Sequence, residues 1–380
     1  MRALIDYRPA LRERSGIGEY THELVRALAA SYVPARLDLS VFSSSWKDRL
    51  DLREPDFAPV HQIDRRWPVR TLNFAWHRLG SPAVETLTGQ AFDVVHSMTP
   101  LLVPTQSAAQ VVTIADLSFL TDPTWTRAEV RRDYPDLVRA HAQQADGVIV
   151  MSEHVRGEVQ RVLGIGGEKV TVVPAGAPRW TPRGAAPANG YVLFVGTLEP
   201  RKNVGILLDA FEKALAGAAE QAGWARRELV LAGKATDAAR EWIDRIARAP
   251  LAGRVRHLGY VDADDRQALY EGASVLVLPS LDEGFGLPVL EAMTIGVPVV
   301  ASRRGSLPEV LGDAGQLVDA DDAQGFADAI DRVLRDKDFA AACAARGIER
   351  SRQFSWSHAA ERTFSLYELA IARRQKCASA

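Results

Sequence analysis

The stretch Ser274–Val300, SVLVLPSLDEGFGLPVLEAMTIGVPVV, decides how this sequence is interpreted. Its first part, Val275–Leu278, is apolar over the length of a short strand, and Pro279 follows directly. A loop then leads into a helix that we expect to begin at Leu287 and Pro288, because proline at a first helical position loses no hydrogen bond. The stretch therefore predicts a strand, a loop and a helix in succession.

The loop of this stretch has the composition of a binding site. Gly284 and Gly286 carry no Cβ, so their backbone can approach a ligand closely. The free N–H groups and positive dipole end of the following helix favour phosphate or a sugar oxygen. Glu283 precedes the helix and Glu291 lies near its start, so both carboxylates can face one small site. Either glutamate alone is more often an ordinary surface residue, but the combination favours a site.

Length and composition limit the class of protein. At 380 residues the chain is expected to form about two domains. With 47% hydrophobic and 25% charged residues it has the profile of a soluble globular protein. A net charge of −2 gives no electrostatic case for nucleic acid. Cys343 and Cys377 suggest neither a disulfide framework nor a metal site, which fits the reducing cytoplasm. No signal peptide or membrane-spanning run is expected, so any membrane contact would be peripheral.

The first half of the chain alternates short strands with helices, which favours a parallel sheet covered on both faces. Gly16 and Gly18 follow the first strand and suit a tight turn into a helix, or half of a nucleotide-binding fingerprint. Ser152 has the position of a helix N-cap, and the GIGG run at 164–167 that of a helix stop. We expect strands at Ala3–Asp6, Asp38–Phe42, Asp93–His96, Val111–Ala115, Gly147–Met151 and Val170–Val173, and helices at Glu19–Ala30, Arg127–Ala145 and Ser152–Leu163.

The segment Pro174–Gly190 is rich in proline and glycine and is the expected linker. After it the alternation restarts, which predicts a second doubly wound sheet whose ligands bind outside the carboxyl ends of the strands. We expect strands at Tyr191–Val195, Leu229–Ala232, Val255–Leu258, Val275–Leu278, Val297–Ala301 and Gln316–Val318, and helices from about Asn203, Ala235, Asp265, Leu287, Leu307, Ala323 and Phe339.

The motif PS-xx-EGFGLP-xx-EAM-xx-GxPVVAS, which contains Glu283 and Glu291, resembles the signature of the retaining family 4 glycosyltransferases. The resemblance implies an α/β protein of the GT-B fold, in which two doubly wound Rossmann-like domains face a central cleft. Residues 1–176 would bind the acceptor and residues 177–354 the nucleotide sugar. Residues 355–380, after Phe354-Ser355-Trp356, would form a crossover helix that packs back on the first domain.

Two adjacent cations, Arg201 and Lys202, stand where a buried strand leads into a helix. A guanidinium can grip two phosphate oxygens and an ammonium acts as a point charge, so the pair suits a diphosphate. The alternative is a solvated helix start, although cations there oppose the helix dipole. Family members often carry an arginine where this chain has Thr197; Lys202 matches the family lysine, and Arg201 is the candidate for the arginine's role. We expect Lys202 to contribute little to the core.

The resemblance also implies roles for the remaining positions. Glu283 would contact hydroxyls of the transferred sugar, and with Arg201 and Lys202 it forms the expected catalytic set. Glu291 would bind the ribose hydroxyls. Backbone groups of the expected donor site come from Gly16, Gly18, Gly284, Phe285, Gly286 and Leu287, while Lys234, Tyr260 and Val261 would border the base and ribose, although for Lys234 an ordinary turn is the more common interpretation.

One position departs from the family pattern. Relatives commonly carry histidine followed by aspartate where this chain has Ala115 and Asp116, which puts full activity or the usual sugar geometry in doubt. His96 ends a neighbouring strand, and a buried structural histidine is the more common interpretation for it.

The segment Arg65–Arg78, RRWPVRTLNFAWHR, interleaves arginines with aromatic residues. This pattern suits a membrane surface or an acidic lipid-linked acceptor. An amphipathic helix with buried aromatics and solvated arginines is the alternative, and both stay open. Histidines and cysteines form no metal-binding cluster in the sequence, so we expect no metal and no cofactor besides the sugar nucleotide.

These observations and the family resemblance predict a metal-independent retaining glycosyltransferase of the cytoplasm, with the inner face of the membrane as an alternative place of action. The run Leu198–Asn203 resembles bacterial mannosyltransferases of surface-polysaccharide assembly, so GDP-mannose is the first choice of donor and a UDP-hexose the second. A glycan or lipid-linked acceptor is implied, and its identity depends on loops of the first domain. The alternatives are a sugar-nucleotide epimerase or phosphorylase on the same fold, and a nucleotide-sugar-binding protein without turnover.

Overall fold

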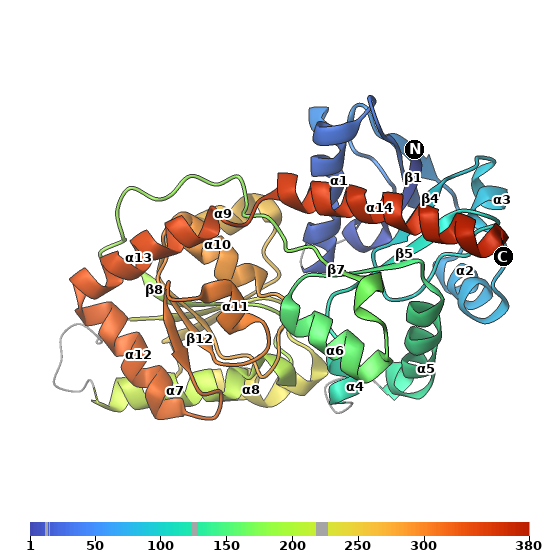
Figure 1. Cartoon of the computed structure of the whole chain (residues 1–380). Helices are drawn as coiled ribbons and strands as arrows, with labels where there is room; N and C mark the ends of the chain where they lie inside the picture. The colour runs from blue at the N-terminus through green and yellow to red at the C-terminus, as the bar shows by residue number, and fades with distance from the viewer. Residues whose placement is uncertain (12–13, 15, 123–127, 218–226, 380) are drawn as a thin grey trace. The chain divides into compact units, whose positions relative to one another are not determined.

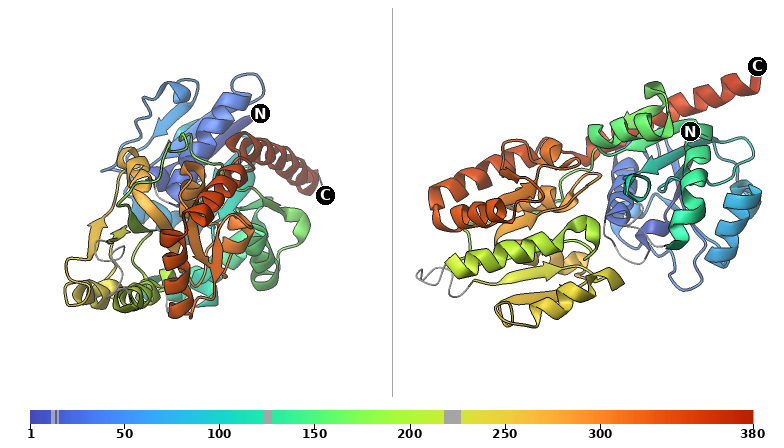
Figure 2. Two further views of the ribbon diagram at one scale, coloured as in Figure 1. Left: turned by 90° about the vertical axis from the view of Figure 1, so that its left-hand side faces the viewer. Right: turned by 90° about the horizontal axis from the view of Figure 1, so that it is seen from below.

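The computed structural model describes residues 1–11, 14, 16–122, 128–217 and 227–379 (Figure 1). The chain divides into two compact units, and each is a parallel sheet with helices on both faces (Figures 1 and 2). Unit 1 comprises residues 1–176 together with 355–380, and unit 2 comprises residues 177–354. The prediction of two doubly wound α/β sheets is confirmed.

The sheet of unit 1 has seven parallel strands in the order β3-β2-β1-β4-β5-β6-β7. Its inner strands are buried along almost their whole length, because helices cover both faces. The strands are β1 (Arg2–Asp6), β2 (Asp38–Ser43), β3 (His61–Asp64), β4 (Val94–Ser97), β5 (Ala109–Ile114), β6 (Gly147–Val150) and β7 (Val170–Val172).

The helices of unit 1 follow the strands in the expected alternation. Ser152 caps one of them, because its hydroxyl accepts a hydrogen bond from the Val155 N–H at 3.2 Å, and that helix ends directly before Gly164. The helices are η1 (Arg8–Ala10), α1 (Ile17–Tyr32), η2 (Pro55–Phe57), α2 (Val69–Phe74), the π-helical turn η3 (Ala75–Leu79), α3 (Val84–Thr88), α4 (Ser118–Thr121), α5 (Ala128–Gln144), α6 (Glu153–Leu163), η5 (Gly167–Lys169) and α14 (Trp356–Ser379).

Strand β3 and the short helix α3 were not expected from the sequence, whereas α2 and η3 lie in the segment for which an amphipathic helix was one of two open interpretations. The β3 strand reads HQID and lacks a run of apolar residues. It lies at the edge of the sheet, where two of its four side chains are exposed. Its extended conformation is fixed by pairing with β2 rather than by its own composition, so local pattern could not reveal it.

The C-terminal helix α14 belongs to unit 1, where it runs along α1 and contacts β4, β5 and β6 (Figure 1). Its Tyr367 hydroxyl lies 2.7 Å from Nδ1 of His96, whose Nε2 lies 2.8 Å from the Thr113 hydroxyl. Burial lowers the pKa of His96 to about 3, so its ring is neutral. His96 is therefore a structural histidine, as its position at a strand end indicated.

The sheet of unit 2 has six parallel strands in the order β10-β9-β8-β11-β12-β13. The strands are β8 (Tyr191–Val195), β9 (Leu229–Ala232), β10 (Val255–Gly259), β11 (Ala273–Leu278), β12 (Val299–Ser302) and β13 (Gln316–Val318). The helices are η6 (Pro200–Lys202), α7 (Val204–Gly217), η7 (Asp237–Ala239), α8 (Arg240–Ile246), α9 (Ala263–Glu271), α10 (Leu287–Ile295), α11 (Leu307–Leu311), α12 (Ala323–Arg335) and α13 (Lys337–Ser351).

Two loops of unit 2 touch at the backbone just beyond β8 and β9. Gly233 has a φ of +145°, and a Cβ at this position would lie 1.9 Å from the carbonyl oxygen of Gly196. The same residues join the ladder, because the Gly196 N–H donates to Ala232 O and the Gly233 N–H to Gly259 O. Position 233 therefore requires glycine for both conformation and space.

We expect Gly233→Ala to destabilise the protein by about 2 kcal/mol or more, since the backbone must shift to admit the methyl group. That loss lowers the thermal midpoint by about 4 °C or more, measurable by calorimetry. Gly157→Ala is the matched control, because a Cβ there meets nothing within 4 Å and position 157 lies inside α6. The control should be neutral or stabilising. Equal midpoints for the two variants would show that the close approach is unimportant.

Candidate active site

In the sheet of unit 2, the direction in which successive strands are added reverses between β8 and β11. From β8 the chain moves outward through β9 and β10, and from β11 it moves outward through β12 and β13. In open parallel sheets, such a switch point leaves a crevice at the carboxyl ends of the two central strands. The loops Gly196–Asn203 and Pro279–Gly286 leave β8 and β11 at this place. The order of the strands therefore brings together the two motifs that the sequence singled out.

Glu283 is the centre of this site and is 5% exposed. Its Oε1 lies 2.5 Å from the ammonium of Lys202 and accepts a hydrogen bond from the Ser280 hydroxyl at 2.7 Å. Its Oε2 lies 3.4 Å from the guanidinium of Arg201. Burial alone would raise the pKa of Glu283, but the ion pairs with Lys202 and Arg201 outweigh it and hold the pKa below its ordinary value. The solvent-facing interpretation of Glu283 is therefore wrong.

The two cations are built into the site. Lys202 is only 8% exposed, so the expectation that it contributes little to the core is wrong. Arg201 donates to the carbonyl oxygen of Asp282 at 2.8 Å and to Glu199 at 2.9 Å. Two cations and two carboxylates give this cluster a formal charge of zero. The sequence suggested that Arg201 and Lys202 are available to a diphosphate, whereas the structure pairs both with carboxylates.

Asn203 fixes the geometry of this network and was not singled out from the sequence. It has a φ of +55° and closes the η6 turn. Its side-chain amide donates to Pro279 O at 3.1 Å and to Ala320 O at 2.7 Å. Three loops at the same sheet edge are thereby tied together. The available signal was an asparagine directly before a helix, since asparagine tolerates the left-handed conformation better than most residues.

The loop before α10 is held by its own backbone. Gly286 has a φ of +92°, and a Cβ there would lie 2.8 Å from Leu307 Cδ2. The Glu283 carbonyl oxygen accepts a hydrogen bond from the Ser306 N–H at 3.0 Å. Helix α10 begins at Leu287 with Pro288 in its first turn, as predicted. Its first N–H groups thus emerge directly beside the Glu283 loop, with Gly284 and Phe285 buried between them.

Glu291 has a different set of partners. The Tyr270 hydroxyl donates to its Oε2 at 2.6 Å, and Arg266 Nε lies 3.3 Å from its Oε1. Trp180 of the linker segment packs against both Tyr270 and Arg266. Burial and the neighbouring carboxylate raise the pKa of Tyr270 well above its ordinary value, so the phenol stays protonated and donates. Tyr270 and Arg266 lie in α9, and no motif in the sequence connected them with Glu291.

The other expected donor-site residues lie on neighbouring loops or in unit 1. Lys234 and Tyr260 follow β9 and β10, and the Lys234 ammonium lies 5.8 Å from the Tyr260 ring centroid. Val261 follows directly and is half-buried. Gly16 is the N-cap residue of α1, and Gly18 is buried at the start of that helix. The roles of these residues in donor binding stay predictions.

Ala115 occupies the position at which family members carry histidine. Ala115 is half-buried at the end of β5. Asp116 accepts hydrogen bonds from the Ser118 N–H at 3.1 Å and the Ser118 hydroxyl at 2.7 Å. Asp116 therefore has a structural role at the start of α4.

Two doubly wound α/β units, one with a buried ion-pair network at its switch point, are the architecture of the GT-B class. Comparison with known proteins agrees with this class. Residues 15–176 match the family model described as "Glycosyl transferase 4-like domain", and residues 189–336 match "Glycosyl transferases group 1". The chain is 30% identical over 394 aligned residues to O-antigen chain mannosyltransferase B of Escherichia coli, covering 97% of this chain and 100% of that protein.

A second relative and two solved structures agree with this family. Phosphatidyl-myo-inositol mannosyltransferase of Mycolicibacterium smegmatis is 32% identical over 246 residues, 62% of this chain and 60% of that protein. Sucrose-phosphate synthase from Thermosynechococcus elongatus superposes with a TM-score of 0.74 at 23% identity, covering 100% of this chain and 99% of that one. WaaG, a glycosyltransferase involved in lipopolysaccharide biosynthesis, superposes with a TM-score of 0.71 at 16% identity, covering 96% and 98%. The chain belongs to the GT4-type glycosyltransferases.

We expect Lys202→Ala to destabilise the protein by about 3–5 kcal/mol at neutral pH, because it leaves the buried Glu283 carboxylate without its nearest cation. The lowered pKa of Glu283 means that the ion pair stabilises the fold above the ordinary carboxyl pKa. That stabilisation is lost as the pH falls through the lowered pKa. The difference between wild type and variant should therefore narrow below about pH 4.

Urea unfolding at several pH values measures this difference. The double variant Lys202→Met/Glu283→Gln is the control, because it removes both charges and should recover most of the stability. A single variant as stable as wild type at neutral pH would rule out a stabilising role for the ion pair.

Proposed function

We propose that this chain transfers a mannosyl group from GDP-mannose to a glycan or lipid-linked acceptor, with retention of configuration and without a metal. The observation that carries the proposal is the Glu283 network at the switch point of unit 2, where Lys202, Arg201 and Ser280 orient one buried carboxylate. The choice of mannose is supported by the full-length relative, which is named a mannosyltransferase. A second relative named for mannosyl transfer supports the same choice.

In this proposal the residues of the site divide the work between sugar and nucleotide. The Glu283 carboxylate accepts hydrogen bonds from hydroxyls of the transferred sugar. The diphosphate lies toward the N-terminus of α10, where backbone N–H groups and the helix dipole favour negative charge. It shares Lys202 and Arg201 with Glu283 rather than meeting free cations. Glu291, held by Tyr270 and Arg266, accepts from the ribose hydroxyls.

The reaction breaks the bond between the anomeric carbon and the β-phosphate oxygen. The acceptor hydroxyl oxygen forms the new bond on the same face of the sugar, and its proton passes to the departing phosphate oxygen. Negative charge grows on the diphosphate in the transition state, and Lys202, Arg201 and the helix terminus are placed to stabilise it. These groups would supply the role that a metal ion has in other transferases.

We expect substitutions of the two glutamates to affect different ligands, Glu291 the nucleotide and Glu283 the sugar. Glu291→Gln should weaken GDP and GDP-mannose alike, by roughly ten- to a hundredfold, the size of a charged hydrogen bond. Glu283→Gln should leave GDP binding unchanged or slightly tighter, because a competing carboxylate is neutralised, while transfer falls at least tenfold. Calorimetry with GDP and GDP release with and without acceptor measure both effects.

Glu349→Gln is the matched control, since Glu349 pairs with Arg352 on the exposed side of α13. Equal loss of GDP affinity in the two site variants would refute this division. GDP release that never depends on an acceptor, for any donor tested, would argue against transfer and favour the epimerase, phosphorylase or binding-protein alternatives.

We also propose that unit 1 contacts an anionic membrane surface. Among the residues the structure describes, no helix combines the length and apolar character needed to cross a bilayer. The segment 65–78 exposes Trp67 by 43% and Phe74 by 62%, whereas Trp76 is buried. The solvated-helix interpretation is therefore right for Trp76 and wrong for the other two aromatics. Trp46 is also exposed, and it lies two residues after Ser44, whose carbonyl oxygen accepts a hydrogen bond from the Trp67 N–H.

Exposed apolar side chains beside arginines suit a lipid headgroup layer. Arg66 and Arg70 are exposed, whereas Arg65 donates to the carbonyl oxygens of Leu87 and Thr88 and is partly structural. The charges best suited to contact lipid are therefore Arg66 and Arg70.

We expect vesicles containing anionic lipid to bind the protein and salt to release it. The double variant Arg66→Ala/Arg70→Ala should lose most of this binding. The separate double variant Trp67→Ala/Phe74→Ala should retain less of the vesicle binding that remains at high salt than the wild type does. Arg352→Ala is the control, because this exposed arginine lies in unit 2. Vesicle flotation measures all four proteins. Equal binding to neutral and anionic vesicles would contradict the proposed surface.

A further inference from the structure

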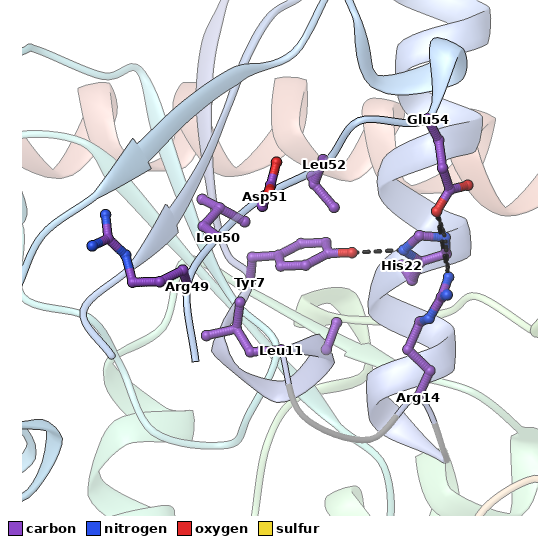
Figure 3. A pocket seen from close by; sticks show the side chains of 10 residues that line it. Tyr7, Leu11, Arg14, His22, Arg49, Leu50, Asp51, Leu52 and Glu54 are labelled. Atoms are coloured by element: carbon purple, nitrogen blue, oxygen red, sulfur yellow. Dashed lines mark hydrogen bonds and ion pairs between the residues drawn. The ribbon is translucent and has the colours of Figure 1, made fainter. Parts of the chain in front are cut away.

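Unit 1 contains a cavity of about 150 Å³ that the proposed chemistry does not use (Figure 3). Tyr7 from the end of β1 and His22 from α1 lie at its base, and the segment 49–54 forms another wall. A water molecule takes about 30 Å³ in the liquid, so the cavity holds about five waters and is large enough for a small polar molecule.

The base of the cavity is a buried Tyr7–His22 pair. The Tyr7 hydroxyl oxygen lies 2.6 Å from Nδ1 of His22, and both side chains are almost fully buried. The other ring nitrogen of His22, Nε2, lies 2.9 Å from Arg14 and 2.9 Å from Arg26. A guanidinium donates hydrogen bonds and never accepts them. Nε2 must therefore be the acceptor, and the single ring proton of neutral His22 sits on Nδ1.

The neutral state of His22 agrees with its surroundings. Burial, together with the positive charges of Arg14 and Arg26, lowers its pKa to about 3. With the proton on Nδ1, His22 donates to the Tyr7 oxygen. The hydroxyl proton of Tyr7 is then left for another acceptor. Within the described part of the chain, the structure gives the Tyr7 hydroxyl no hydrogen bond besides the one with His22.

A buried hydroxyl that keeps a donor unused costs free energy, about 1–3 kcal/mol. A ligand oxygen in the cavity would accept this proton and remove the cost. The cavity therefore has one preferred polar contact, a donor at its base that seeks an uncharged or weakly basic oxygen.

Charges of both signs meet at the mouth of the cavity. Oε1 of Glu54 lies 3.6 Å from Arg14 and 3.6 Å from His22 Nε2, and its Oε2 pairs with Arg26. Arg26 also pairs with Glu23 and Asp56, so the guanidiniums there are compensated by carboxylates. Arg49 and Asp51 face other residues, because they form ion pairs with Asp64 and Arg53. An anionic ligand would meet Glu54, and a cationic one would meet Arg14.

The remaining wall is apolar, with Leu11, Leu50 and Leu52 around the Tyr7 ring (Figure 3). The cavity therefore offers hydrogen-bond donors and acceptors beside aliphatic carbon. This combination matches a neutral polyhydroxylated ring, because its hydroxyls donate and accept hydrogen bonds and its C–H face is apolar. A phosphate or a lipid chain would leave one half of these groups unused.

We propose that this cavity binds a sugar residue of the acceptor glycan, with the Tyr7 hydroxyl donating to a sugar oxygen and Glu54 accepting from sugar hydroxyls. His22 is a positioning residue, because it acts by fixing the direction of the Tyr7 proton. The inference rests on the proposed function, since it assigns the acceptor of that transfer to a neutral carbohydrate.

The test uses the full chain with methyl α-D-mannopyranoside as the probe. Saturation-transfer NMR measures binding of the probe. Tyr7→Phe removes only the hydroxyl, and we expect it to weaken the probe and raise the acceptor KM about three- to tenfold. GDP affinity should not change. Tyr32→Phe is the matched control, because Tyr32 stacks on Phe364 at the far end of α1. Leu52→Trp, which fills the cavity, should abolish probe binding.

The outcomes separate the two proposals. Normal transfer with unchanged acceptor KM and probe binding in both Tyr7→Phe and Leu52→Trp would overturn the cavity assignment and leave the transferase standing. Inorganic phosphate displacing the probe would also overturn it, in favour of an anion site. A wild type that transfers no sugar from any donor would overturn the proposed function, whereas probe binding would still decide the chemistry of the cavity. A ¹⁵N spectrum showing a protonated Nε2 on His22 would contradict the Tyr7 donor.

Discussion

The buried contact between Glu283 and Lys202 is the constraint on which the site of unit 2 depends. A carboxylate with so little exposure is tolerated only when its charge is compensated, and the ammonium 2.5 Å away compensates it. The pair spans the gap between the loops that follow β8 and β11. It therefore ties the conformation of both loops to one electrostatic interaction, and Asn203 reinforces that tie through backbone carbonyls.

A formally neutral network limits how the diphosphate of the proposed donor would bind. Arg201 and Lys202 are already paired with Glu199 and Glu283, so a diphosphate cannot simply settle on free cations. It would share them, and the helix N-terminus beside Gly286 becomes correspondingly important. Pre-paired charges cost little reorganisation when charge develops during a reaction, which is the condition for strong electrostatic stabilisation.

Much of the fold followed from the chain's local pattern. The strands at Tyr191–Val195 and Leu229–Ala232, the N-cap at Ser152 and the proline-started α10 are each specified by neighbouring residues. The polar edge strand β3 was missed, because its conformation comes from pairing with β2. Glu283 and Glu291 were found from one motif, and the family resemblance implied different roles for them, but neither revealed their partners. Their charged partners come from α9 and η6, which are separate elements of the fold.

The sequence by itself determined the α/β class, the glycine-bearing loop before α10 and the positions of Arg201, Lys202 and Glu283 on loops that follow strands, because these depend on spacing within a few turns of chain. Tertiary structure alone decided which charges pair, since the order of strands brings the β8 and β11 loops together. It also decided the Tyr7–His22 contact, which joins the end of β1 to α1 with two arginines around one imidazole. Long-range packing buries His22 and brings Arg14 and Arg26 to it. Burial and these charges keep its ring neutral, and the guanidiniums decide which ring nitrogen accepts.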